Sequence, residues 1–144
     1  MRAKITRTEE CEALNVLGVP HIVHVAAAET NGTITFAEMQ VPPGAGIPRH
    51  VHAREDEVFH VLAGQVAFEV NGTETVVGPG TTVFGPRNVP HAYRNAGTDT
   101  ARILVTLTPG GLEGMFAELA KLPAGPPDLA VVSKIVGRYG VSFA

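Results

Sequence analysis

The stretch that decides the fold is GAGIPRHVHAREDEVFHVLAG, residues 44–64, in which two histidines and a glutamate lie between glycines. Side chains alternate between the two faces of a β-strand, so His50 and His52 point to the same side. Glu57 lies at an odd offset from His52, which would place it on the opposite face of one continuous strand. We therefore predict that segment 53–56 turns the chain and brings Glu57 back beside the histidines from the next strand.

The same alternation orients the side chains in and after this turn. Phe59 shares the inward face with Glu57, whereas His60 points away from it and is not expected to bind a metal. Glu55 and Asp56 fall within the turn itself. We expect both of these carboxylates to be solvated and to take no part in acid–base chemistry.

A further histidine, His91, lies in PRNVPHAYRN, residues 86–95, where two prolines fix the backbone of an approach loop. Imidazole nitrogens combined with a carboxylate oxygen suit Fe, Mn, Ni, Co, Cu or Zn better than Ca or Mg. The sequence thus predicts one divalent transition metal per chain, with its identity open and no other cofactor site. The predicted metal ligands are His50, His52, Glu57 and His91.

Two motifs in this region resemble those of the cupin superfamily. The first cupin motif is a glycine, five residues, His-x-His, three or four residues, Glu, six residues and Gly. The second is a glycine, five residues, Pro-x-Gly, two residues, His, three residues and Asn. The matching residues are Gly44, His50, His52, Glu57 and Gly64 for the first motif, and Gly80, Pro86, His91 and Asn95 for the second.

One position departs from the second motif, because Asn88 stands where the pattern has glycine. Asparagine is the residue that most readily replaces glycine at a positive φ, so we expect the turn to be kept. The resemblance implies that the four residues named above hold a divalent metal inside a small β-barrel. It also implies a homodimer.

The fold class predicted for the chain is all-β, a double-stranded β-helix (cupin, jelly-roll-like) barrel with two short C-terminal helices. One domain, 1–144, is expected, with the barrel core at about 21–108 and a helical segment at 109–144. Sixteen glycines and eleven prolines separate short β-rich runs, and a meander that closes on itself is the simplest arrangement. The predicted strands are 21–26, 33–41, 49–52, 57–62, 65–70, 74–77, 81–84, 91–95 and 101–108.

The C-terminal segment carries helical spacing of its apolar residues. Leu112, Met115 and Phe116 begin one such stripe, and we interpret them as packing residues. After a proline-rich break, Asp128 is placed to cap a second short helix.

Composition limits the partners of the protein. The 144 residues are 44% hydrophobic and 17% charged, the formal charge is −3, and no cluster of Lys or Arg is present. These values argue against nucleic acid and membrane partners and favour a small-molecule ligand. Cys11 has no partner for an internal disulfide, and no signal peptide is seen, so a cytoplasmic location is expected.

Strand alternation also predicts a largely apolar pocket around the metal. Such a lining suits an aromatic ligand, although these side chains can equally serve only to fill the barrel. His21 and His24 are not predicted to be ligands. The predicted pocket residues are Phe59, Val61, Phe68 and Tyr93, with Val66 and Val70 also facing inward.

The likeness continues beyond the two motifs. The HVHxxEDExFxVLxG and PRxVPHAYxN patterns, followed by a Pro-Gly-Gly helix start, resemble the quercetin 2,3-dioxygenase-like branch of single-domain cupins. That resemblance implies a metal-dependent dioxygenase for a small aromatic or flavonol-like substrate, with Glu57 as the catalytic base. The alternatives are a non-oxidative metal-dependent isomerase or lyase, or a cupin that binds a small molecule without catalysis.

Overall fold

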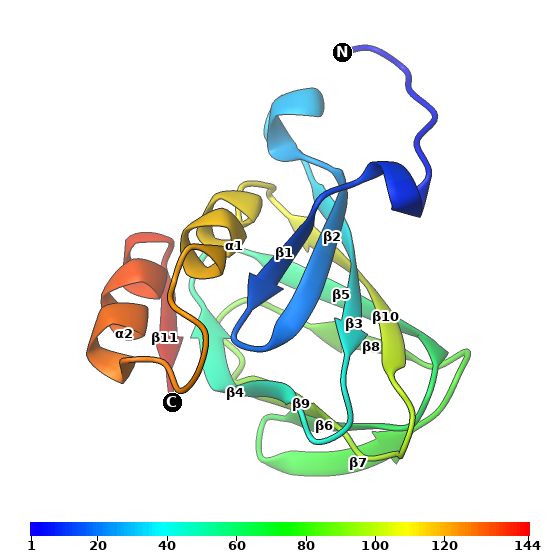
Figure 1. The fold of residues 1–144 in the computed structure, drawn as a ribbon, viewed down its shortest axis with the longest axis vertical. Helices are drawn as coiled ribbons and strands as arrows, with labels where there is room; N and C mark the ends of the chain where they lie inside the picture. Colours follow the sequence, from blue (N-terminus) through cyan, green and yellow to red (C-terminus); the bar gives the residue numbers. More distant parts are fainter.

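A computed structural model describes residues 1–144 as two antiparallel β-sheets that face each other, with helices on one side (Figure 1). The first sheet, sheet A, has six strands. In spatial order they are β1 (Ala13–Val16), β2 (Val19–Val25), β3 (Thr35–Val41), β10 (Ala101–Thr108), β5 (Asp56–Ala63) and β8 (Thr82–Gly85). The strands of the second sheet, sheet B, are β11 (Val141–Phe143), β4 (Gly46–His52), β9 (His91–Asn95), β6 (Val66–Val70) and β7 (Thr73–Val77).

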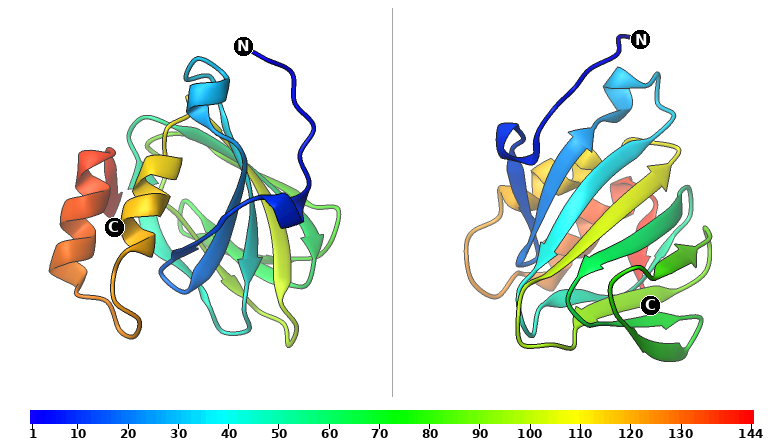
Figure 2. Two further views of the ribbon diagram at one scale, coloured as in Figure 1. Left: turned by 45° about the horizontal axis from the view of Figure 1, so that its top comes forward. Right: turned by 90° about the vertical axis from the view of Figure 1, so that its right-hand side faces the viewer.

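The path of the chain is that of a double-stranded β-helix, which confirms the predicted fold class. From β3 to β10 the chain passes back and forth between the two sheets, except at the β6–β7 hairpin. The predicted meander is wrong, because strand neighbours are not sequential: β10 lies between β3 and β5. The sheets also do not close into one hydrogen-bonded barrel; they stack face to face (Figure 2).

The core lies between the sheets and follows the alternation of each strand. In β5 and β10 every second side chain is buried and the intervening ones are more exposed. Full burial of each large apolar side chain contributes about 1.5–3 kcal/mol to stability. The buried side chains that join the two sheets are Phe59, Val61, Val66, Phe68, Ile103, Val105 and Leu107.

Two turns depend on their residue type. Gly64 has φ +88°, and a Cβ atom there would lie 2.9 Å from the Ala101 backbone, so no other residue fits without a shift. Asn88 has φ 66°, which confirms that asparagine keeps the turn for which the second motif has glycine.

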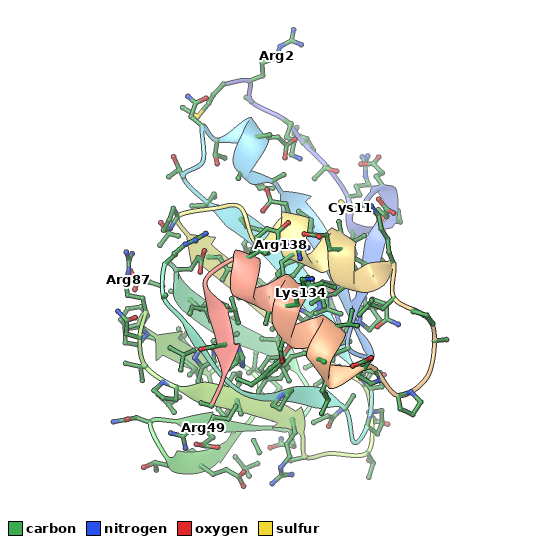
Figure 3. The ribbon with its side chains drawn as sticks, turned by 90° about the vertical axis from the view of Figure 1, so that its left-hand side faces the viewer. Arg2, Cys11, Arg49, Arg87, Lys134 and Arg138 are labelled. Atoms are coloured by element: carbon green, nitrogen blue, oxygen red, sulfur yellow. The ribbon has the colours of Figure 1, made fainter.

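The C-terminal segment forms α1 (Glu113–Ala120), α2 (Leu129–Arg138) and then β11. Asp128 caps α2 as predicted, because its Oδ1 accepts a hydrogen bond of 2.9 Å from the Ala130 N–H. Figure 3 shows α2 on the outside of the molecule, with Lys134 and Arg138 on it. Neither helix has the length and apolar character needed to cross a membrane.

Two strands lie outside the predicted strand range of 21–108. β1 pairs with β2 through a tight turn in which Leu17 and Gly18 have φ 52° and 86°. β11 pairs with β4, so His52 lies opposite Val141. Two short 3-10 helices, Thr8–Glu10 and Ala27–Glu29, complete the chain.

Candidate metal centre

Three of the four predicted ligands come from sheet B and the fourth comes from sheet A. His50 and His52 lie on β4, and His50 is paired with His91 on the neighbouring strand β9. Glu57 lies near the start of β5 and points at them from the opposite sheet. The turn predicted between His52 and Glu57 is therefore the crossing from one sheet to the other.

A β-bulge in β4 aims the histidines inward. The register with β9 shifts by one residue between Ile47 and His50, across Pro48, which has no N–H to donate. The extra residue lets both Ile47 and His50 face the interior, although they are an odd number of positions apart. Arg49, within the bulge, faces outward and pairs with Glu69.

The four side chains form a compact, buried cluster. One donor atom from each lies within 4.8 Å of the others. Glu57 Oε2 is 2.6 Å from Nε2 of His91 and 3.1 Å from Nε2 of His52. The exposed fraction of these residues ranges from 2% for His91 to 7% for His50. His60 lies on the outer face as predicted, where its Nδ1 contacts the Thr82 hydroxyl.

Two of the imidazoles are oriented by backbone carbonyls. Nδ1 of His50 is 2.7 Å from the Pro48 carbonyl oxygen, and Nδ1 of His91 is 3.2 Å from that of Val89. A carbonyl only accepts, so Nδ1 carries a proton in both rings. Nε2 is thus the nitrogen that each ring presents to the cluster.

The third imidazole, that of His52, faces the Glu55 side chain instead of a carbonyl, and the prediction that Glu55 is solvated is wrong. Glu55, expected to be solvated, is only 5% exposed, and its Oε2 lies 3.4 Å from Nδ1 of His52. Asp56 does face outward, where it binds Arg87 through two side-chain contacts of 2.9 and 3.1 Å. Figure 3 shows Arg87 at the edge of the molecule. The turn therefore sends one carboxylate inward and one outward.

Burial and the neighbouring charges together set the protonation of the cluster. Burial lowers the pKa of His50 to about 4. Burial also acts to lower the pKa of His52, but the Glu57 and Glu55 carboxylates outweigh burial and raise this pKa to about 9. Burial acts to raise the pKa of Glu57, yet the His52 and His91 imidazoles hold it well below its usual range. Glu57 is therefore a carboxylate in the folded protein.

The donor set fits a transition metal. Nε2 of His52, Nε2 of His91 and Oε2 of Glu57 are buried and lack a hydrogen-bond partner, which is costly unless something else satisfies them. Donors bonded at about 2.1 Å to one ion lie roughly 3–4 Å apart, whereas Glu57 Oε2 lies 2.6 and 3.1 Å from two of the nitrogens and all four donors lie within 4.8 Å of one another. The chemistry of three imidazoles and a carboxylate does not distinguish among the six metals considered.

An apolar cavity of about 50 Å³ lies directly beside the cluster, with His50 and Glu57 in its wall. Of the four predicted pocket residues, Phe59 and Tyr93 line it. Val61 and Phe68 do not; they are buried in the core, where Phe68 packs against the rings of Phe59 and Tyr93.

Two polar side chains face this cavity besides the cluster. His21 is 4% exposed, its Nδ1 lies 2.8 Å from the Val19 carbonyl oxygen, and its ring contacts Phe116. Burial lowers its pKa to about 4, so the ring is neutral at pH 7 with Nε2 as a free acceptor. Burial raises the pKa of Tyr93, whose hydroxyl donates to Met39 Sδ at 3.1 Å.

The remaining wall comes largely from the C-terminal segment. Met115 and Phe116, which the sequence indicated only as packing residues, also line the cavity, together with Leu119 of α1 and Val141 of β11. Helical spacing identifies the buried side of α1, but it does not say which part of the protein that side covers. The inward position of His21 could have been predicted more readily than the cavity-lining role of α1, because His21 lies in a predicted strand among apolar residues.

Together, the two facing sheets and the buried cluster define a β-sandwich protein with a candidate metal centre at one end of its core. The family model of the cupin domain matches residues 37–107, which run from β3 to β10 and contain the whole cluster. Residues 37–107 are therefore a cupin domain.

Three similar proteins illustrate the range within this family. An oxalate-binding protein of Thermotoga maritima is 27% identical over 92 residues, which is 62% of this chain and 76% of that protein. Quercetin 2,3-dioxygenase of Bacillus subtilis is 29% identical over 99 residues, 69% of this chain but only 29% of that enzyme. A crystal structure of a predicted oxalate decarboxylase from Thermotoga maritima has a TM-score of 0.67 at 25% identity, covering 73% of this chain and 98% of that one.

Proposed function

We propose that the protein is a metal-dependent dioxygenase for a small, oxidisable and largely apolar substrate, with His50, His52, Glu57 and His91 as the metal ligands. The observation that carries this proposal is the contact between the cluster and the apolar cavity: His50 and Glu57 belong to both. The similarity to quercetin 2,3-dioxygenase supports it.

The bound metal would supply Lewis acidity and, for Fe, Mn, Ni, Co or Cu, redox chemistry. Four protein donors leave up to two of the six positions of an octahedral ion free. The chain provides the surroundings: the apolar side chains of Met115 and Phe116 line the cavity beside Glu57.

Glu57 is the proposed catalytic base. Its position in the cavity wall places its carboxylate within reach of a hydroxyl group that enters the cavity. Nε2 of His21 can accept a second hydrogen bond from the same ligand. Tyr93 stays protonated and is engaged with Met39, so it is not a base.

The size of the cavity restricts the substrate. Drug-sized ligands occupy pockets of about 300–1,000 Å³, whereas this cavity measures about 50 Å³. One water molecule needs roughly 10–15 Å³ on the same measure. A ligand of a few heavy atoms fits as the structure stands, and a flavonol-like substrate requires α1 or its neighbours to move.

Oxygen uptake tests the proposal. Protein loaded separately with Fe²⁺, Mn²⁺, Ni²⁺, Co²⁺ or Cu²⁺ is mixed with small enols, catechols and flavonols, and an oxygen electrode records consumption. We expect uptake with at least one metal and substrate, and its loss in Glu57→Gln protein that still binds the metal. No uptake with any combination would refute the dioxygenase.

A second function has its own support. The similarity to the oxalate-binding protein, together with the small cavity, favours a protein that binds a small ligand on the metal without oxidation. The cavity wall contains no Lys or Arg, so an anion would depend on the metal for its charge. Calorimetric binding of oxalate to Zn²⁺-loaded protein, with no oxygen uptake in any metal form, would favour this function.

The homodimer also remains a proposal. Phe84 and Val58 are 57% and 40% exposed and lie opposite each other on β8 and β5, with Leu62 on the same outer face. Such an apolar surface is suited to a second copy of the chain. Sedimentation of the wild-type protein and of Phe84→Glu would test it, with dissociation expected in the variant.

A further inference from the structure

Glu55 is the acidic side chain beside the cluster to which the proposed chemistry gives no role. It is 5% exposed, and Lys and Arg side chains form no ion pair with it. Its Oε2 lies 3.4 Å from Nδ1 of His52, longer than an ordinary hydrogen bond, and neither atom has a hydrogen-bond partner. The His52 imidazole is therefore the group with which this buried side chain can pair.

The surrounding backbone holds Glu55 in this inward position. The His52 carbonyl oxygen accepts from the Asn88 N–H at 2.7 Å, and the Ala53 N–H donates to the Gly140 carbonyl at 2.9 Å. At the other end of the turn, the Arg87 N–H donates to Asp56 Oδ1 at 2.8 Å. Both ends of the turn are fixed by segments far away in the sequence, which leaves Glu55 directed at His52.

The comparison among the three imidazoles shows what Glu55 does. His50 and His91 are each oriented by a backbone carbonyl two positions earlier in the chain. His52 has no such carbonyl, and the only acceptor that Nδ1 faces is Glu55. Because a carboxylate accepts more strongly than a carbonyl, it also makes the opposite nitrogen a stronger donor to a metal.

We propose that Glu55 is a positioning residue that accepts the Nδ1–H of His52 and holds Nε2 of that ring toward the metal. This inference rests on the metal centre proposed above.

Metal affinity tests this role without any substrate. Co²⁺ is titrated into wild-type, Glu55→Gln, Glu55→Ala and Asp56→Asn protein in competition with a chelator of known affinity. We expect about 10–100-fold weaker binding for Glu55→Ala and a smaller loss, of about threefold or more, for Glu55→Gln. Asp56→Asn removes the same charge from the same turn but faces outward, so it should stay within about twofold of the wild type.

The outcomes separate the two proposals. Wild-type protein that binds no Co²⁺ refutes the metal centre and the role of Glu55 with it. Tight wild-type binding together with Glu55→Gln and Glu55→Ala affinities within twofold refutes the role of Glu55 alone. Circular dichroism of the metal-free variants checks folding, and Glu55→Gln, which keeps the shape of the side chain, carries the test if Glu55→Ala does not fold.

A second measurement reports the contact directly. In Zn²⁺-loaded protein, ¹⁵N-edited NMR should show the His52 Nδ1–H proton far downfield, because it is held by a carboxylate. Glu55→Gln should move it upfield, while the His50 and His91 protons stay in place as internal controls. A His52 signal that is unchanged in Glu55→Gln contradicts the proposal.

Discussion

Replacing His21 by asparagine should change how the stability of the protein depends on pH. Burial lowers the pKa of His21 from 6.5 to about 4 in the folded state. Between these values the unfolded chain binds a proton that the folded chain does not, so the free energy of unfolding falls as the pH falls. At 1.36 kcal/mol for each pH unit, this window corresponds to a loss of about 3 kcal/mol between pH 7 and pH 4.

Urea denaturation at intervals from pH 7 to pH 4, with a chelator present, measures this effect. Asparagine at position 21 keeps a donor for the Val19 carbonyl but cannot titrate. All other titratable groups are the same in both proteins, so the difference between the two curves isolates His21. Met39→Leu, which alters the same cavity wall without a titratable group, serves as the control and should follow the wild-type curve. Parallel curves for His21→Asn and the wild type would refute the neutral, buried imidazole and its use as an acceptor in the cavity.

Four further predictions concern the metal and the fold. His91→Ala should weaken Co²⁺ binding by at least about 100-fold in equilibrium dialysis, since the ring is one of four donors; unchanged binding would contradict its role. Gly64→Ala should lower the free energy of unfolding by about 1–3 kcal/mol, because φ is +88° and the added Cβ meets backbone. Gly137→Ala, in open space on α2, should instead be stabilising by roughly 0.5–1 kcal/mol. Asp128→Ala should cost about 1 kcal/mol in thermal or urea unfolding through loss of the α2 cap, and no loss would mean that packing alone holds this helix.

Much of the fold and of the candidate site follows from local rules in the sequence. Alternation in β5 predicts that Glu57 and Phe59 face inward and that His60 faces outward, because a strand packed on one side admits only one register. The β6–β7 hairpin follows from Asn71-Gly72, which has φ 49° and 86°. These features depend on a few neighbouring residues, so the sequence is sufficient to predict them.

The features that the sequence could not supply depend on distant segments. Glu55 lies in a polar turn that reads as exposed, and it becomes buried because Gly140 and the loop containing Asn88 close around the turn. The strand β11 has only three residues and exists because β4 offers an edge for pairing. Strand alternation likewise places Val61 and Phe68 inside, but whether an inward side chain meets a cavity or the core depends on what covers that end of the sheets.

The candidate metal centre and much of the cavity wall beside it lie in different parts of the chain, which bears on ligand specificity. The cupin domain match, 37–107, contains the four cluster residues and Glu55. The elements that bound the cavity opposite the cluster lie outside it: His21 on β2, Met115 and Phe116 on α1, and Val141 on β11. The same C-terminal segment fixes the turn of Glu55 through Gly140. On the functions proposed above, a shift of this segment would alter the cavity volume and the orientation of His52 together, so ligand size and metal affinity should vary together when the packing of α1 and β11 is changed.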